Sequence, residues 1–469
     1  MAKLKTVYVC AECGQSAPRW LGRCPSCNAW GSLAEERERS PATATRLSGH
    51  SGGAGGADVD ASRGKPVKLS EVQPDGARRM PTGIAELDRV LGGGLVGGGV
   101  VLVGGDPGIG KSTLLLQALA GLAANGQRAL YVTGEESGAQ VALRAARLEC
   151  EGVHSVEVLA TTELEQIEDA MAKARPSAMV VDSIQTMRCA QLESSAGTVS
   201  QLREVTARLV DNAKAHGIGV FLIGHVTKEG AIAGPKVLEH LVDTVLAFEG
   251  DATLSYRIVR TTKNRFGAAQ ELGVFEMVRE GLREVQDPSR LFLSERPQHA
   301  AGSVVVPTAQ GQRPLLVEVQ ALVAPAAYGA SRRVATGLDG NRLAILLAVL
   351  ERKAHVQVLD QDVFVSVVGG ARVDEPAVDL ALAAAIASSL RDRPVRHDTV
   401  LFGEVGLTGE VRSVPRAGQR LAEARKLGFS RAILPESSLE RLRAEERTGL
   451  DLVGVRTLAE ALQAVFGAR

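Results

Sequence analysis

The chain has 469 residues, of which 45% are hydrophobic, and basic and acidic residues balance at 54 each. This length exceeds what one core usually serves, so two or three domains are expected. The balanced charge excludes the strongly basic signature of many nucleic-acid binders. No run of about 18 apolar residues predicts a transmembrane helix. Because Met1–Lys5 leads into cysteines without an apolar stretch, we also expect no signal peptide and a cytoplasmic location.

The first recognisable feature is a pair of CxxC motifs, formed by Cys10, Cys13, Cys24 and Cys27. Two such pairs let four thiolates converge tetrahedrally on one Zn²⁺ ion. A disulfide pair or a redox-active CxxC motif would use the same residues, but the duplicated spacing in a cytosolic chain favours zinc. Residues 1–33 are therefore predicted to form a four-cysteine zinc finger.

The two tryptophans of the chain, Trp20 and Trp30, lie inside or beside this finger. We expect them to supply its small core, since a module of this size cannot fold without metal or disulfides. Residues 34–64 are rich in Ala, Ser, Gly and Thr. They cannot bury enough apolar surface to order themselves and are predicted to form a flexible linker.

Residues 65–289 alternate apolar, β-branched runs with helical patterns, which predicts an α/β domain with a mostly parallel sheet. The expected strands are 100–103, 129–133, 178–182 and 220–223. Two further runs, 244–248 and 256–260, are interpreted as a terminal hairpin.

The most informative stretch matches G-x-x-x-x-G-K-[ST], the phosphate-binding P-loop, between a predicted strand and a run of helix formers. Its residues are Gly105, Asp106, Pro107, Gly108, Ile109, Gly110, Lys111, Ser112 and Thr113. Glycines let backbone N–H groups turn toward phosphates, and a helix N-terminus favours negative charge. The motif predicts ATP or ADP binding, with Lys111 at the β- and γ-phosphates and Ser112 as a ligand of Mg²⁺.

Acidic residues follow two of the predicted strands. Asp182 closes an apolar run in the Walker B form and is predicted to hold the Mg²⁺ shell, although it or Ser183 could instead cap the next segment. Glu135 and Glu136 stand where a parallel sheet borders the nucleotide crevice. One of them, Glu135 first, is the candidate base that orients water; the alternative is that one or both cap the following helix.

Three later features leave alternatives open. His225 follows a strand, where it could sense the γ-phosphate or be purely structural. The loop Thr227–Lys236 contains two lysines and two glycines and suits either a nucleic-acid backbone contact or a plain surface. Lys263 and Arg265, in the run KNRFG, could complete a neighbouring subunit's nucleotide site in the manner of an arginine finger, or could simply be solvated.

Together these motifs resemble the RadA (Sms) family of bacterial DNA-repair and recombination proteins, over essentially the whole chain. The segments Thr82–Asp88 and Leu91–Gly94 look like the lead-in of RecA-type ATPases, and the run KNRFG is a signature of the family. The resemblance implies a RecA-like ATPase core, with Lys263 and Arg265 at the subunit interface and Thr227–Lys236 facing DNA. It also implies a homo-hexameric ring that binds single-stranded and branched DNA, drives branch migration with ATP, and works with the recombinase RecA.

Residues 290–469 form a separate α/β domain that is similar to the Lon protease domain. Lon cleaves peptides with a Ser–Lys pair; here Ala377 stands at the nucleophile's place and Gly418 falls near the lysine's place, so proteolysis is expected to be absent. A scaffold or DNA-binding role is then implied. The candidate residues for a basic patch in this domain are Arg332, Arg333 and Arg342.

Two rival functions are weighed against a DNA-dependent ATPase. A Lon-type ATP-dependent protease is motivated by the C-terminal resemblance, and Ala377 argues against it. A regulatory ATPase of the KaiC type, which would bind protein rather than DNA, is disfavoured by the zinc finger and KNRFG.

Overall fold

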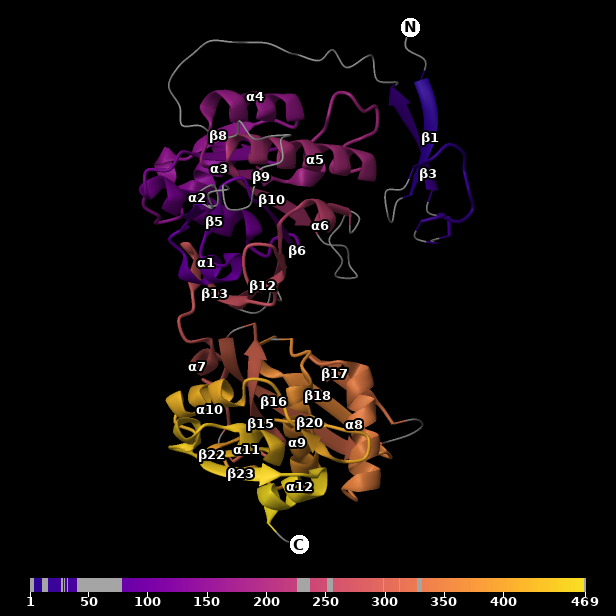
Figure 1. Cartoon of the computed structure of the whole chain (residues 1–469), viewed down its shortest axis with the longest axis vertical. Helices are drawn as coiled ribbons and strands as arrows, with labels where there is room; N and C mark the ends of the chain where they lie inside the picture. The colour runs from indigo at the N-terminus through magenta and orange to yellow at the C-terminus, as the bar shows by residue number, and fades with distance from the viewer. Residues whose placement is uncertain are drawn as a thin grey trace, which may run out of the picture. The chain divides into compact units, whose positions relative to one another are not determined.

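The computed structural model describes residues 4–10, 16–26, 28, 30–31, 33–39, 78–225, 237–250, 256–297, 299–311, 313–326, 331–370 and 372–467. The chain divides into two compact units (Figure 1). The first comprises Met1–Glu249, Val259–Gly267 and Met277–Leu282, and the second Gly250–Ile258, Ala268–Glu276 and Arg283–Arg469.

A three-stranded antiparallel sheet, in the order β2-β1-β3, forms at the N-terminus. Its strands are β1 (Leu4–Cys10), β2 (Ser16–Ala17) and β3 (Leu33–Arg39). Strand β3 pairs with β1 from Cys10↔Leu33 to Leu4↔Arg39. Residues 34–39 therefore belong to this sheet and not to the predicted linker, because each has a backbone partner in β1. The other linker residues, 40–64, lie outside the described part of the chain.

The prediction that the tryptophans form the core of the finger is wrong. Trp20 is 58% exposed and Trp30 is 77% exposed. The buried cluster among the described residues of this module is instead formed by Cys10, Cys24 and Leu33. The cysteines point inward, where a shared ligand would lie, and the bulky indoles are left at the surface.

A nine-stranded sheet runs in the order β14-β13-β12-β11-β6-β10-β9-β7-β8. Its strands are β6 (Val100–Gly105), β7 (Ala129–Thr133), β8 (Glu157–Ala160), β9 (Ala178–Asp182), β10 (Gly219–His225), β11 (Thr244–Glu249), β12 (Tyr256–Asn264), β13 (Leu272–Val278) and β14 (Gly281–Glu284). The strands from β11 to β8 in this order are parallel. The predicted core strands are confirmed, but β11 and β12 are not terminal, since β13 and β14 extend the sheet.

Six α-helices are described in this unit. They are α1 (Ala85–Leu91), α2 (Lys111–Ala124), α3 (Gly138–Ala145), α4 (Leu164–Ala174), α5 (Val199–His216) and α6 (Val237–Leu241), and a short antiparallel pair is formed by β4 (Arg79–Met80) and β5 (Leu95–Val96). Residues of α4 and α5 join alternate strand residues such as Leu102, Val132 and Val181 in one apolar cluster. Strand β6 is buried along its whole length, as expected for a parallel strand covered on both faces.

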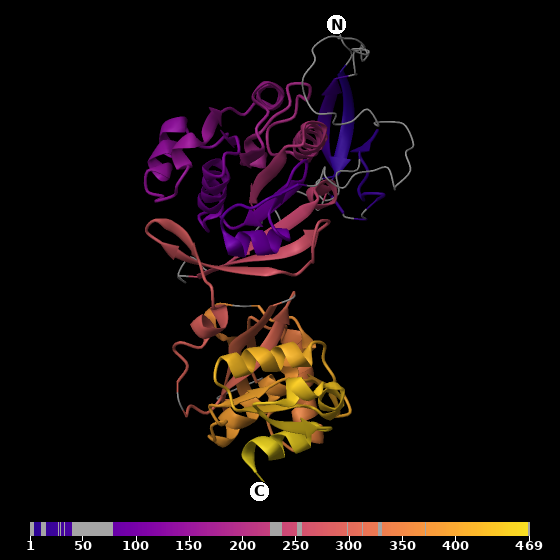
Figure 2. The ribbon, with the colours of Figure 1, turned by 60° about the vertical axis from the view of Figure 1, so that its left-hand side comes forward.

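The second unit is built on a seven-stranded sheet in the order β17-β18-β16-β15-β19-β22-β23. Its strands are β15 (Ser303–Gln310), β16 (Arg313–Pro325), β17 (Arg333–Thr336), β18 (Gln361–Val367), β19 (Thr399–Leu401), β22 (Arg431–Pro435) and β23 (Asp451–Val455), and β20 (Glu404–Val405) pairs with β21 (Val411–Arg412). The helices are α7 (Pro288–Phe292), α8 (Gly340–Lys353), α9 (Asp379–Arg391), α10 (Ala417–Lys426), α11 (Glu436–Arg441) and α12 (Leu458–Phe466). Helices α9 and α10 pack against β15 and β16, and α10 lies across the strands in Figure 2.

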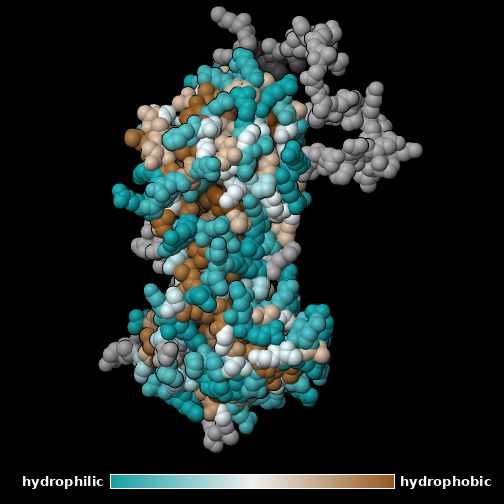
Figure 3. Space-filling view, turned by 90° about the vertical axis from the view of Figure 1, so that its left-hand side faces the viewer, coloured by the Kyte–Doolittle hydropathy of each residue, from teal (hydrophilic) through white to brown (hydrophobic). Residues whose placement is uncertain are grey.

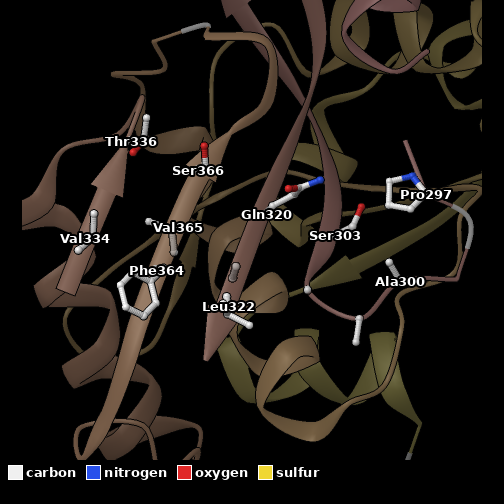
Figure 4. Close-up of a pocket in the computed structure, with 13 residues that line it drawn as sticks. Pro297, Ala300, Ser303, Gln320, Leu322, Val334, Thr336, Phe364, Val365 and Ser366 are labelled. Carbon is white, nitrogen blue, oxygen red and sulfur yellow. The ribbon is translucent and has the colours of Figure 1, made fainter. Parts of the chain in front are cut away.

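One cavity of this second unit, of about 490 Å³, lies on the sheet and is lined in part by apolar side chains (Figure 4). Phe364 of β18 pairs in register with Val334 of β17 and Leu322 of β16, so the three side chains form a row across the strands. Neither Ala377 nor Gly418 lines this cavity. It is therefore distinct from the positions that match the Lon catalytic pair.

Hydrophilic residues cover much of the molecular face shown in Figure 3. Within the ranges that the structure describes, no helix combines the length and the apolar character needed to cross a bilayer.

Candidate nucleotide site and its surroundings

The P-loop connects β6 to α2 with a backbone that depends on glycine. Gly110 precedes α2 with φ of 115°, a conformation that L side chains rarely adopt. A Cβ at Gly110 would also lie 2.8 Å from Cε of Met277. Within residues 78–225, no side chain caps the first turn of α2, so its backbone N–H groups are available to an anion. The loop has the backbone expected of a phosphate cradle.

Lys111 is the buried cation of this loop, at 4% exposure. Its Nζ donates hydrogen bonds to the carbonyl oxygens of Gly105, at 2.7 Å, and Asp106, at 2.8 Å. Burial lowers the pKa of the Lys111 ammonium, and the negative charges of Asp182, Asp106 and Glu135 partly offset this effect. The structure thus places Lys111 within electrostatic range of Asp182 and Glu135, two of the three predicted acidic residues.

Asp182 ends β9 beside Thr133 of the neighbouring strand β7. Its carboxylate accepts a hydrogen bond from the Tyr131 hydroxyl, and Nη1 of Arg144 lies 4.0 Å from the same oxygen. Burial, together with the charge of Asp182, raises the pKa of Tyr131 far above its ordinary value. The phenol therefore stays protonated and donates to Asp182. This aspartate is held by a buried donor and does not act as a helix cap.

The two adjacent glutamates are used differently. Glu135 accepts a hydrogen bond from the Ser183 hydroxyl, next to Asp182, whereas Glu136 forms an ion pair with Arg144 of α3. Helix α3 is capped by the Ser137 side chain. The alternative in which a glutamate caps this helix is therefore wrong. Glu135 lies at the same end of the parallel strands as Lys111 and Asp182, where the strands end and the loops begin; we call this end the strand edge.

The structure describes only part of the other candidate residues near the P-loop, His225 and the loop that follows it. His225 ends β10, where its backbone pairs with Gly105 of β6, so the residue stands directly beside the start of the P-loop. Its side chain and the loop Thr227–Lys236 lie outside what the structure describes. The two roles weighed for His225 both remain open.

Lys263 and Arg265 form hydrogen bonds and an ion pair with residues of their own chain. Nζ of Lys263 donates to the carbonyl oxygens of Glu239, at 2.6 Å, and Val242, at 2.7 Å, at the end of α6. Arg265 pairs with Asp243 at 3.0 Å, and the other carboxylate oxygen of Asp243 accepts from the backbone N–H of β6. Burial, and then the nearby Arg265, lowers the pKa of Lys263. The Arg265 side chain is nevertheless 52% exposed, so part of it faces outward.

The described half of the predicted zinc site fits a metal centre. Cys10 and Cys24 are fully buried in a cluster that contains few apolar residues. The backbone N–H of Asn28 donates to the Cys24 carbonyl at 3.0 Å, and Asn28 has φ of 63°, so the chain turns tightly after Cys24. Cys13 and Cys27 lie outside the described residues. Inward thiols over a small core are the donors that Zn²⁺ prefers.

In the second unit, the positions that match the Lon pair are blocked. Ala377 is buried, at 1% exposure, and its carbonyl accepts from the N–H of Gly403. A Cβ at Gly418 would lie 2.2 Å from Oε1 of Glu446, so a larger side chain has no room there unless Glu446 moves.

Two of the three arginines considered for a basic patch pair with buried carboxylates. Arg332 pairs with Asp362, and Arg342 makes a bidentate pair with the fully buried Asp379. Arg333 is exposed. Arg342 therefore serves first to satisfy an interior charge.

Sequence reasoning missed Tyr131 and Arg144, and considered Ser183 only as a possible cap, although all three hold the acidic residues in place. A tyrosine within an otherwise apolar strand was the one available signal, because a buried hydroxyl needs a partner. Nothing in the spacing pointed to the other two, whose partners depend on how the strands and α3 come together.

The parallel sheet, its P-loop and the acidic edge beside Lys111 define a P-loop ATPase of the α/β class. Family matches agree with this class: residues 65–231 match the AAA domain, residues 8–35 the rubredoxin metal binding domain, and residues 348–468 the Lon protease (S16) C-terminal proteolytic domain.

Similar proteins cover the whole chain. It is 47% identical to DNA repair protein RadA of Bacillus subtilis over 100% of both chains. It is 52% identical to the Pseudomonas aeruginosa RadA over 99% of this chain and 100% of that one, and 50% identical to the Escherichia coli RadA over 98% and 99%. The chain belongs to the RadA family of DNA repair proteins.

Proposed function

We propose that this protein is a DNA-dependent ATPase of homologous recombination and DNA repair. It binds single-stranded and branched DNA and uses ATP hydrolysis to drive branch migration of recombination intermediates. The observation that carries the ATPase is the P-loop with its buried Lys111, whose charge interacts with those of Asp182 and Glu135. Membership of the RadA family supports DNA as the substrate.

Each residue at the strand edge has a separate proposed role in ATP hydrolysis. Lys111 binds the β- and γ-phosphates, while Ser112 and Asp182 hold Mg²⁺, which neutralises charge on the phosphate oxygens when bound. Glu135 orients the attacking water, because it is the glutamate that its neighbours place beside Asp182. Glu136 instead fixes Arg144, which in turn donates to Tyr131 at 3.2 Å.

Lys263 and Arg265 are proposed to act on the nucleotide of a neighbouring subunit in a homo-hexameric ring. The exposed half of Arg265 supports this role, since a cation presented at the surface can stabilise charge that develops on a transferred phosphoryl group. The loop Thr227–Lys236 is proposed to face DNA, and the recombinase RecA is the proposed protein partner. We place the ring in the cytoplasm.

The domain division that we propose extends the zinc finger from 1–33 to 1–39, because β3 ends at Arg39. The linker then covers 40–64, and the RecA-like ATPase domain over 65–289 and the Lon-like domain over 290–469 are proposed as predicted. The Lon-like domain is proposed to be a scaffold without protease activity. Ala377 has no nucleophilic atom, and Glu446 occupies the space next to Gly418.

The deciding experiment measures ATP hydrolysis with and without single-stranded DNA, and casein cleavage in parallel. We expect DNA to stimulate hydrolysis and casein to stay intact. Lys111→Ala should lose hydrolysis by two or more orders of magnitude, because positioning and charge carry phosphoryl transfer. Lys173→Ala, at an exposed lysine of α4 paired with Asp169, is the matched control and should be unaffected.

The same experiment separates the rivals. Casein cleavage that follows the pure protein would select the protease. Hydrolysis that DNA leaves unchanged would select an ATPase that acts on protein.

A further inference from the structure

Both tryptophans of the chain lie exposed on the N-terminal ribbon, which is the described part of residues 4–39. Trp20 and Trp30 border the same glycine: a Cβ at Gly22 would lie 3.7 Å from Cζ3 of Trp30 and 3.8 Å from Cη2 of Trp20. Exposing two indoles to water is unfavourable unless a ligand covers them. The described core of the ribbon does not use them, since its buried cluster consists of Cys10, Cys24 and Leu33.

The charged side chains that the structure describes beside this aromatic pair are cationic. The Arg23 guanidinium lies over the Trp30 ring, 5.9 Å from its centroid, and its Nε donates to the Asn28 carbonyl at 3.0 Å. Arg19 is exposed next to Trp20. Residues 14–34 contain these two arginines and no aspartate or glutamate. The surface therefore combines aromatic faces with positive charge.

We propose that Trp20 and Trp30 form a stacking platform for unpaired bases of single-stranded DNA, with Arg19 and Arg23 contacting the phosphates. Binding of single strands without sequence preference uses this combination, since every base has a flat face and every nucleotide a phosphate. A protein partner would also suit exposed tryptophans, but the absence of acidic residues from the segment favours a polyanion. The proposal rests on the proposed function only in taking single-stranded DNA as the ligand.

The test uses full-length, zinc-loaded protein and a fluorescein-labelled oligothymidylate. Because the chain has only two tryptophans, its tryptophan emission reports on this platform alone. We expect the oligonucleotide to quench this emission, and quenching should follow the same binding curve as fluorescein anisotropy. Acrylamide should then quench the tryptophans less efficiently.

Variants then measure how much the rings contribute. Trp20→Ala and Trp30→Ala should each weaken oligothymidylate binding by about tenfold, at the lower end of what loss of one base stack gives. Trp20→Phe and Trp30→Phe should bind nearly as the parent does. Leu407→Ala, at another exposed apolar residue (72%), is the control and should bind normally. Zinc content should be unchanged throughout, because the indoles lie outside the ribbon's core.

The proposal falls if DNA binds and stimulates hydrolysis while tryptophan emission and the alanine variants stay unchanged; the proposed function would then stand. It also falls if the alanine variants keep DNA affinity but lose binding to a recombinase filament, which would make the platform a protein site. If the parent protein binds no single-stranded DNA, the platform and the proposed function fail together.

Discussion

At the scale of single residues, neighbours in sequence serve different purposes at the strand edge. Glu135 contacts Ser183 and Glu136 contacts Arg144. The two carboxylates are chemically alike and one residue apart, so only their partners distinguish the proposed base from the structural ion pair.

This difference can be tested by removing one charge at a time. Glu135→Gln should lower ATP turnover by about two or more orders of magnitude while nucleotide binding persists, because an amide cannot take up a proton from water. Glu136→Gln should reduce turnover less, since its effect must pass through Arg144. Turnover and nucleotide affinity are measured separately for both variants. If both variants lose the same amount of turnover, or if Glu136→Gln loses more, then Glu135 is not the base.

Arg342 provides a second test at this scale, against Arg333. Arg342→Ala should destabilise the Lon-like unit by about 3 kcal/mol, because it leaves the buried Asp379 without its cation. Burial already raises the pKa of Asp379 and Arg342 counteracts this, so the loss should shrink as the pH falls toward the ordinary pKa of a carboxyl group. Denaturant unfolding of parent and variant at several pH values measures this loss of stability. Arg333→Ala should leave stability unchanged; equal stability of both variants would contradict the structural role.

The sequence could predict those site residues whose pattern lies within one short segment of the chain, and it could not predict contacts between distant segments. The P-loop is one contiguous motif and Asp182 ends an apolar run, so both were readable as patterns. The Tyr131–Asp182 and Ser183–Glu135 contacts join residues 51 and 48 positions apart. Such pairs form only when β7 and β9 lie side by side, which residue spacing does not reveal.

At the scale of elements, apolar runs predicted the buried parallel strands of the nine-stranded sheet but missed the exposed β8, and they also missed β13 and β14. Strand β8 (Glu157–Ala160) lies at the sheet edge and is mostly exposed. Its apolar run, residues 158–160, is only three residues long, which is too short to indicate a strand. Strand β3 was missed because its sequence LAEERER is mostly charged, and only backbone pairing with β1 makes it a strand.

The ribbon offers a test at this scale. Cys24→Ser should release about one zinc per chain and unfold the ribbon, because its apolar cluster is too small to hold β1 and β3 together without metal. Metal analysis and proteolysis of residues 1–39 are the measurements. Hydrolysis without DNA should persist, since the P-loop and its partners lie in residues 78–284. Retained zinc, or none in the parent protein, would contradict the zinc-finger prediction.

At the scale of the whole molecule, the KNRFG run is the place where the proposed assembly can be tested. Within one chain, Arg265 pairs with Asp243, which also binds the first residue of β6. If Arg265 is purely structural, it affects ATP hydrolysis only in its own subunit, through its ion pair with Asp243. An Arg265 that acts on the neighbour's nucleotide would use the half of its side chain that is exposed.

Mixing subunits distinguishes the two roles. Arg265→Ala should lower ATP turnover much more than nucleotide affinity, because a group that acts on transition-state charge is barely engaged in the ground state. When variant and parent subunits are mixed, activity should fall below simple dilution, since each parent site needs a competent neighbour. Lys263→Ala should act similarly but less severely, because a lysine offers a point charge and no bidentate fork. Arg128→Ala, at an exposed arginine paired with Glu157, is the control and should mix by dilution. A linear decline for Arg265→Ala would place its action within its own subunit.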